Sequence, residues 1–116
     1  MKQNTPELRA PLVVVCHDAG ACNVILPWLA APGLALRPVM QGPAARLFAQ
    51  RFSEVPRWPL ETALDGAAML LSGTGWESDL EHRARKLARL RGLFSVAVID
   101  PGIFITMRNS DLGKIK

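Results

Sequence analysis

The fold is decided by residues 68–91, which read AMLLSGTGWESDLEHRARKLARLR. The apolar beginning predicts a buried strand over Ala68–Leu71, because a short apolar run bounded by turn residues is typical of a strand covered on both faces. The glycines of Ser72–Gly75 then predict a turn, and an amphipathic helix follows. Together these are half of a βαβ unit, and the turn lies where open α/β sheets bind ligands.

The rest of the chain continues the same alternation. Apolar and β-branched runs predict strands over Leu12–Cys16, Ala35–Met40 and Leu93–Ile99, and apolar residues at helical spacing predict helices over Ala21–Ala30, Pro43–Phe52 and Leu60–Asp65. The alternation predicts an α/β fold, namely a three-layer α/β/α Rossmann-like sandwich that forms a single domain. We expect a parallel sheet of about five strands in the order 3-2-1-4-5.

Some segments have more than one interpretation. Residues 53–58 form either a short third strand or a loop. Pro27 implies a kink or a late start of its helix, because proline lacks the N–H that bonds back one turn. Ile103–Met107 can add an edge strand after a turn. We assign residues 11–107 to the domain, residues 1–10 to a polar extension and residues 108–116 to a polar, mobile tail.

The helix of the deciding stretch carries its own start signal. Ser78 and Glu81 have the spacing of a capping box, in which the serine oxygen accepts from the glutamate N–H and the carboxylate accepts from the serine N–H. The helix is therefore predicted to begin at Asp79, with Glu81 and Arg85 as an i,i+4 ion pair. Its buried stripe is predicted to consist of Leu80, Ala84, Leu87 and Ala88.

Basic charge is concentrated on the same helix, which has no acidic residue after Glu81. We interpret this cluster as a solvated helix face with cations near the negative end of the helix dipole. The less favoured alternative is a partner-binding patch or a peripheral membrane contact made by Arg83, Arg85, Lys86 and Arg89.

Composition narrows the functional classes. The chain has 116 residues, of which 49% are hydrophobic, and it carries 14 basic and 10 acidic residues. Nucleic-acid binding is not favoured, because such proteins spread basic charge over several elements and interleave aromatic side chains, whereas this chain has three Trp, four Phe and no Tyr. Cys16 and Cys22 fit neither a metal-ligand spacing nor a redox motif, so we expect buried, reduced thiols.

Hydrophobic segments are short. The longest apolar stretch, residues 24–36, is interrupted by prolines and falls short of the roughly 20 residues that span a membrane. The residues before Leu12 lack the pattern of a signal peptide. We therefore expect a cytoplasmic protein without a transmembrane segment.

The predicted topology brings two loops together. In sheets of this kind the strand order reverses beside the first strand, so the loops that follow Leu12–Cys16 and Ala68–Leu71 become neighbours across a crevice. We predict His17 and Asp18 as catalytic residues at this crevice. The predicted ligand-binding residues are Gly20, Gly73, Thr74, Gly75 and Trp76.

His17 is the candidate general base, because an imidazole at a strand end can exchange a proton near neutral pH. Asp18 is expected to orient this ring or to cap the following helix. The alternative, which we weigh equally, is a structural histidine that bonds to the neighbouring loop. No second histidine lies nearby, so we predict no metal site and no cofactor.

Phosphate binding at the second loop is a weaker hypothesis. Its glycines match neither the dinucleotide fingerprint nor a P-loop. Glu77 and Asp79 place negative charge at the helix start, where they would repel a pyrophosphate. A tight turn with a hydroxyl contact from Thr74 is at least as well supported.

Several strings resemble an uncharacterised group of bacterial proteins associated with surface-polysaccharide synthesis. They are VVVCHDAGACNVI, QGPAARLF, LLSGTGWESDLEHRARKLAR and VAVID, and the resemblance covers roughly residues 11–100. The fold of that group is similar to the amino-terminal lobe of two-lobed GT-B glycosyltransferases and sugar-nucleotide 2-epimerases.

The resemblance implies a glycosyltransferase-like protein that binds a sugar or a nucleotide-sugar. His17 occupies the position from which GT-B enzymes often supply the base for the acceptor hydroxyl, while the other lobe binds the donor. The similar proteins continue beyond residue 100. We therefore expect either a truncated or frame-altered chain, or a lobe that is completed by another subunit or in a homo-oligomer. In each case the chain is expected to be inactive alone. The alternative function is a non-catalytic binding or assembly module.

Overall fold

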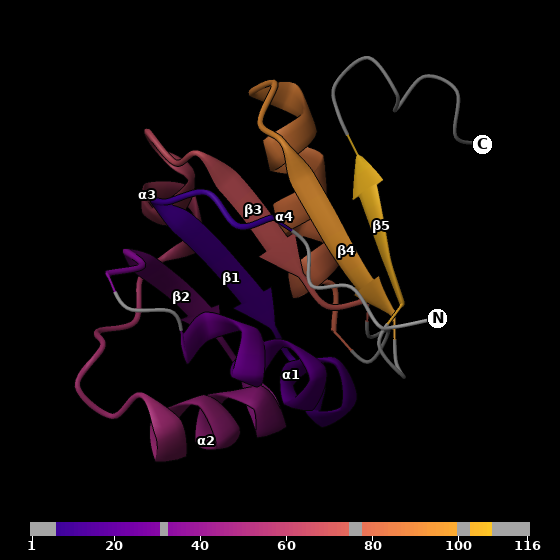
Figure 1. Ribbon diagram of the computed structural model, residues 1–116. Coiled ribbons are helices and arrows are strands. Elements are labelled where there is room, and N and C mark those ends of the chain that lie inside the picture. Colours follow the sequence, from indigo (N-terminus) through magenta and orange to yellow (C-terminus); the bar gives the residue numbers. More distant parts are fainter. Residues whose placement is uncertain (1–6, 31–32, 75–77, 100–102, 108–116) are drawn as a thin grey trace.

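The computed structural model describes residues 7–30, 33–74, 78–99 and 103–107, the last of these as backbone only. Strands and helices alternate along these ranges (Figure 1). The strands are β1 (Leu12–Cys16), β2 (Leu36–Met40), β3 (Met69–Ser72), β4 (Ser95–Ile99) and β5 (Ile103–Met107). The helices are α1 (Ala19–Ile25), the 3₁₀ helix η1 (Leu26–Ala30), α2 (Gly42–Arg51), α3 (Leu60–Leu64) and α4 (Leu80–Leu90).

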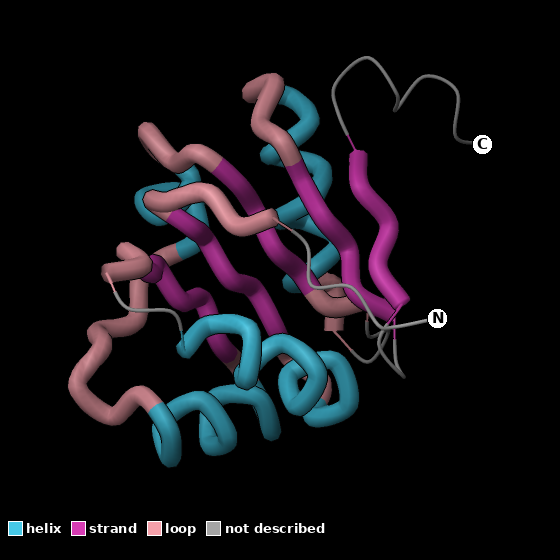
Figure 2. The backbone as a smooth tube through the Cα atoms, in the orientation of Figure 1, coloured by secondary structure: helices cyan, strands magenta, loops and turns pink. Residues whose placement is uncertain are grey.

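The strands form one sheet in the order β2-β1-β3-β4-β5. β1 pairs in parallel with both β2 and β3, β3 pairs in parallel with β4, and β5 runs antiparallel to β4. Figure 2 shows the strands as one layer with helices on both sides. Because β2 and β3 flank β1 on opposite sides, the carboxyl ends of β1 and β3 form the switch point of the topology.

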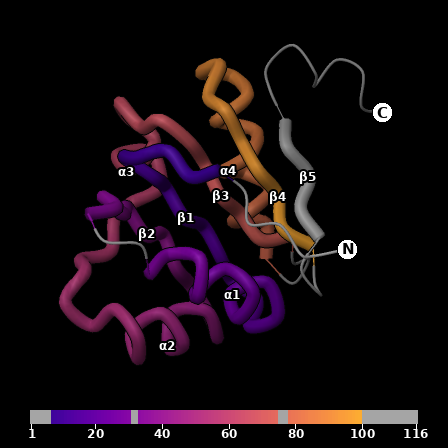
Figure 3. The backbone as a smooth tube through the Cα atoms, viewed as in Figure 1, coloured from indigo at the N-terminus to yellow at the C-terminus, as the bar shows by residue number. Residues whose placement is uncertain are grey.

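Each face of the sheet is covered by its own helices. α1 and α2 pack on one face, and α3 and α4 on the other (Figures 1 and 3). The central strand β1 is fully buried, and its residues alternate between the two cores, with Val14 in one and Val15 in the other. The predicted α/β fold with a parallel sheet in a single compact domain is therefore confirmed.

Residues 53–58 form a loop rather than a third strand. The N–H of Trp58 donates to the carbonyl oxygen of Pro38 (2.8 Å), on the side of β2 that faces away from β1. The N–H and C=O of one residue in a parallel strand point to the same side, so Pro38 lacks the donor that a further strand would need there. Pro56 lacks another. The predicted five-stranded parallel sheet and its order 3-2-1-4-5 are not confirmed, since four strands are parallel and the added edge strand is β5.

The helices are short, and in the part of the chain that the structure describes none is long and apolar enough to cross a membrane. α1 begins at Ala19, so a late start of this helix is wrong. The discontinuity implied by Pro27 is present as a change of winding, because α1 ends at Ile25 and η1 continues from Leu26. A proline near the start of a new helical segment costs little, since the first N–H groups of a helix have no intrahelical acceptor.

Part of the expected polar extension contacts the domain. Leu8 packs against the core beneath α1 and α2, and the guanidinium carbon of Arg9 lies 4.4 Å from the ring centroid of Phe94. Residues 1–6 of the extension and the expected tail, residues 108–116, lie outside the described residues.

Phe48 offers a test of the core assigned to α1 and α2. Its side chain is 1% exposed and stacks on Phe52 with ring centroids 5.0 Å apart. We predict that Phe48→Ala lowers the free energy of unfolding by about 3–5 kcal/mol, because it removes a buried ring and leaves a cavity. Urea unfolding followed by circular dichroism measures the loss. Gln50→Ala on the exposed side of α2 is the control and should change stability by no more than about 0.5 kcal/mol; equal losses would contradict this packing.

Candidate functional site

The loops that follow β1 and β3 lie side by side at the carboxyl edge of the sheet. The N–H of Gly73 donates to the carbonyl oxygen of Val15 (3.0 Å), which continues the pairing of the two strands. The structure therefore brings the loop that begins at His17 next to the loop that begins at Gly73. The other residues predicted in the second loop, Gly75 and Trp76, and the acidic Glu77 lie outside the described residues.

A buried carboxylate closes the gap between these two loops. Glu81 is fully buried, and its Oε2 atom accepts a hydrogen bond from the main-chain N–H of His17 (3.0 Å). Gly73 leaves the space that this carboxylate occupies, because a Cβ atom at that position would collide with Oε2 of Glu81 and lie 2.9 Å from Cβ of Ala21. The first turn of α4 is thereby tied to the end of β1.

The serine half of the predicted capping box is wrong. α4 begins at Leu80 instead of Asp79, and Oγ of Ser78 accepts from the N–H of Leu80 (3.1 Å) rather than from that of Glu81. The carboxylate of Glu81 accepts a hydrogen bond from the main-chain N–H of His17, which the capping box did not predict. A buried N–H without an acceptor costs about 1–3 kcal/mol. The N–H groups at a helix start can instead bond to water. The carboxylate of Glu81 therefore stabilises the fold more by accepting from the buried N–H of His17 than by capping its own helix.

Arg85 of α4 also contacts the loop that follows β3. Its Nη1 atom donates to the carbonyl oxygen of Gly73 (2.6 Å) and to Oγ of Ser72 (3.2 Å). Burial lowers the pKa of Arg85, and the negative charge of Glu81 opposes that shift, as expected from the predicted i,i+4 spacing. Arg85 therefore does not belong to the exposed basic cluster, which is confined on this helix to Arg83, Lys86 and Arg89 and continues at Arg91.

His17 is fixed on several sides. Besides the bond to Glu81, its carbonyl oxygen accepts from the N–H of Ala44 in α2 (3.1 Å). The imidazole lies against Gly42, where a Cβ atom would approach Nε2 to 2.7 Å. Gly42 also has a φ of 58°, a conformation that favours glycine. The position of the ring is therefore set by the backbone at the start of α2, and no side chain at residue 42 would leave it undisturbed.

Asp18 faces His17 rather than capping α1. Its Oδ1 atom lies 3.6 Å from Nδ1 of His17, and the two side chains are 32% and 20% exposed. Asp18 is the N-cap residue of α1 but makes no capping hydrogen bond through its side chain. Of its two predicted roles, orientation of the imidazole fits the geometry better. Gly20, a predicted ligand contact, lies in the first turn of α1.

Thr74 fastens the second loop to the sheet. Its Oγ1 atom donates to the carbonyl oxygen of Val98 in β4 (2.9 Å). This bond matches the interpretation of the loop as a tight turn with a threonine hydroxyl contact. A ligand at this wall would meet an oxygen that can still accept a hydrogen bond but whose proton is engaged.

Two buried thiols lie beneath the His17 loop. Cys16 and Cys22 are free and fully buried, as predicted, and the Cys22 thiol contacts the carbonyl oxygen of Ala44 (3.8 Å). The hydrogen bond between the two thiols, followed by burial and by the charge of Glu81, raises the pKa of Cys16. The same hydrogen bond lowers the pKa of Cys22. The two thiols titrate as a pair, and their shared hydrogen bond favours the thiolate at Cys22.

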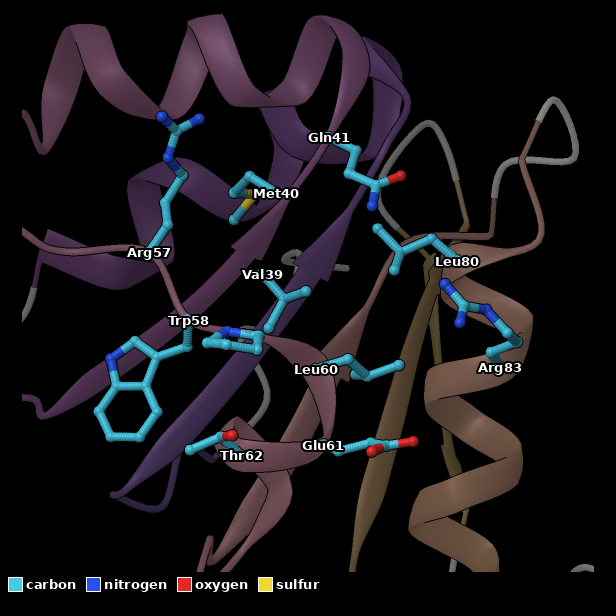
Figure 4. Close-up of a pocket in the computed structure, with 11 residues that line it drawn as sticks. Val39, Met40, Gln41, Arg57, Trp58, Leu60, Glu61, Thr62, Leu80 and Arg83 are labelled. Carbon is cyan, nitrogen blue, oxygen red and sulfur yellow. The ribbon is translucent and has the colours of Figure 1, made fainter.

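A cavity beside β2 was not predicted from the sequence. Its volume is about 370 Å³, and it lies at the carboxyl end of β2, between the loop that precedes α3 and the start of α4 (Figure 4). No periodic pattern marks its lining, because the residues come from separate segments. Only Trp58, an aromatic residue placed between two prolines, is a sequence signal that could have drawn attention to this region. Within the described residues, no three His, Cys, Asp or Glu side chains gather as a metal site would require.

Comparison of the chain with protein-family models, with curated proteins and with solved structures found no match.

The substitution Glu81→Gln tests whether the carboxylate acts through its bond to the buried His17 N–H or through a capping box. We predict that this substitution lowers the free energy of unfolding by about 1–3 kcal/mol, because it removes the negative charge that faces the His17 amide and the partly buried Arg85. The control Glu61→Gln, at an exposed position of α3, should cost no more than about 0.5 kcal/mol. Glutamine serves a capping box as well as glutamate does, so a cost near zero in urea unfolding would contradict the interior role.

Alkylation distinguishes the two thiols. We predict that iodoacetamide modifies Cys22 before Cys16 in the folded protein, because the lowered pKa gives Cys22 the larger thiolate fraction and the thiolate is the nucleophile. Peptide mass spectrometry after short exposures at about pH 8 measures the order. Both rates should rise in urea, since both thiols are buried. Faster modification of Cys16 would contradict the direction of the hydrogen bond.

Proposed function

We propose that the chain is a glycosyltransferase-like lobe that binds a sugar or a nucleotide-sugar, with His17 as the general base. The observation that carries the proposal is the position of His17, at the carboxyl end of the central strand, with its backbone held by Glu81 and Ala44. A general base is most effective when its position is fixed before the substrate arrives. Asp18, 3.6 Å from Nδ1, supplies the charge that would stabilise the imidazolium.

The proposed chemical step is a proton transfer from a sugar hydroxyl. The imidazole of His17 takes the proton as the hydroxyl oxygen attacks the donor carbon, and the leaving group departs with the bonding electron pair. The negative charge of Asp18 then stabilises the positively charged imidazolium ring of His17. The donor would be bound by a second lobe, as the resemblance to GT-B enzymes implies.

Glu81 favours the acceptor role over phosphate binding at this crevice. Its buried carboxylate uses the His17 amide, one of the N–H groups that a phosphate would need, and its charge opposes a second anion. A neutral sugar hydroxyl meets no such repulsion. The crevice therefore suits an acceptor sugar better than the diphosphate of a nucleotide-sugar. Involvement in surface-polysaccharide synthesis belongs to the same proposal and rests on the resemblance alone.

Ligand binding tests the proposal, and the chain carries an internal control. It contains two histidines, His17 in the crevice and the exposed His82 on α4. We predict that an acceptor sugar shifts the NMR signals of the His17 ring and leaves those of His82 unchanged. At about a hundredfold the dissociation constant, the ligand should stabilise the fold by about 2.7 kcal/mol, which raises the melting temperature by several degrees.

The panel consists of free monosaccharides and nucleotide-sugars, with His82→Gln used to assign the two histidine signals. If no compound moves either the melting curve or the His17 signals, the sugar-binding function is wrong, and the non-catalytic module remains.

A further inference from the structure

The cavity beside β2 has a chemical character of its own. Its floor is formed by the buried side chains of Val39 and Leu80 and the half-buried Leu60. Its rim is polar, with the amide of Gln41, the guanidinium of Arg83 and the carboxylate of Glu61. In Figure 4, Gln41, Leu80 and Arg83 lie on one side, Leu60 and Glu61 lie below them, and Arg57 and Trp58 lie on the opposite side.

The outer wall of this cavity is held by Arg37. Its guanidinium carbon lies 4.7 Å from the ring centroid of Trp58, and its Nη1 atom donates to the carbonyl oxygens of Ala63 (3.0 Å) and Asp65 (2.6 Å). The N–H of Trp58 also donates to Pro38 of β2. These contacts fix the loop before α3 and the end of α3 against β2. Contacts within the protein therefore define the shape of the cavity.

The rim combines hydrogen-bond donors with acceptors. Arg83 can only donate, Glu61 as a carboxylate can only accept, and Gln41 can do both. A hydroxyl group also donates and accepts, so neighbouring hydroxyls on one ring can satisfy all three side chains. An anion could pair with Arg57 or Arg83 but would leave the carboxylate of Glu61 without a donor, and a fully apolar ligand would leave all the rim groups without partners.

The cavity size decides between a single sugar and a larger ligand. Small-molecule sites range over roughly 300–1,000 Å³, and a volume of about 370 Å³ falls near the lower end. This volume accommodates one hexose ring, whereas a complete nucleotide-sugar would extend beyond the cavity. The apolar floor is suited to the C–H face of such a ring.

We infer that this cavity binds one sugar ring, whose hydroxyls bond to Gln41, Glu61 and Arg83 and whose carbon face packs on Leu60 and Val39. The class of ligand rests on the proposed function, whereas the place rests on the cavity. Gln41 and Leu80 are the chain neighbours of Gly42 and Glu81, which both contact His17. A sugar held here would therefore lie close to the His17 loop.

The experiment uses Arg83 and a matched cation on the same helix. Isotope-labelled protein is titrated with glucose, N-acetylglucosamine, mannose and galactose, and separately with inorganic phosphate. We expect one of the sugars to shift the signals of the Gln41 side-chain amide and the Trp58 indole N–H in a saturable manner. Arg83→Met should weaken the affinity for that sugar at least tenfold, because a hydrogen bond to a charged group is lost. Arg89→Met, which removes an exposed cation outside the cavity, should leave the affinity unchanged.

The outcomes separate this inference from the proposed function. Sugar-dependent shifts confined to His17 and Thr74 would overturn the cavity site and leave the proposed function intact. Equal losses for the two arginine variants would also overturn it, as would phosphate binding at Gln41 with no sugar binding. If no sugar and no nucleotide-sugar binds anywhere on the protein, both proposals fail. Among the described residues, the exposed side chain of Arg83 pairs with Asp79 (3.6 Å), so its substitution should leave the fold intact.

Discussion

The bond from the His17 main chain to the buried carboxylate of Glu81 is the interaction on which the candidate site depends. It joins the end of the central strand to the first turn of α4, two segments that are 64 residues apart in the chain. Gly73 provides the space for the carboxylate, and Arg85 supplies the opposite charge while holding the same loop. The loops at the switch point are consequently positioned by the buried carboxylate of Glu81, by the partly buried guanidinium of Arg85 and by main-chain hydrogen bonds. Removing the charge of Arg85 would leave the buried carboxylate with less compensation.

The elements of the fold could be predicted because each depends on a local pattern. Leu12–Cys16 is apolar at every position, as a strand covered on both faces requires, and the stripe at Leu80, Ala84 and Ala88 has helical spacing. Residues 53–58 were ambiguous because their structure depends on Pro38, in a strand more than a dozen residues earlier. The missing N–H of that proline ends the sheet on this side, and pairing between distant segments is not visible in a local pattern.

The capping box shows why the site was less predictable than the fold. The spacing of Ser78 and Glu81 indicates that two hydrogen bonds can form, but it does not indicate what else the carboxylate can reach. In the folded chain the buried amide of His17 competes for that carboxylate and binds it. The cavity was missed for a related reason, since Arg37 builds its wall through carbonyl groups of Ala63 and Asp65 that no side-chain motif reveals.

The crevice at His17 and the cavity beside β2 differ in the charges that surround them. A carboxylate lies beneath the crevice at His17, whereas two guanidinium groups and one carboxylate border the cavity beside β2. An anionic ligand would therefore have a higher electrostatic energy near His17 than near Arg83. Solvent screens the buried charge of Glu81 less than the charges that border the cavity, which increases this difference. A sugar hydroxyl, which is neutral until its proton leaves, is the group that both regions can accommodate. In the proposed reaction, Glu81 would oppose the negative charge that develops on that oxygen, so the proton would pass to His17 as the new bond forms.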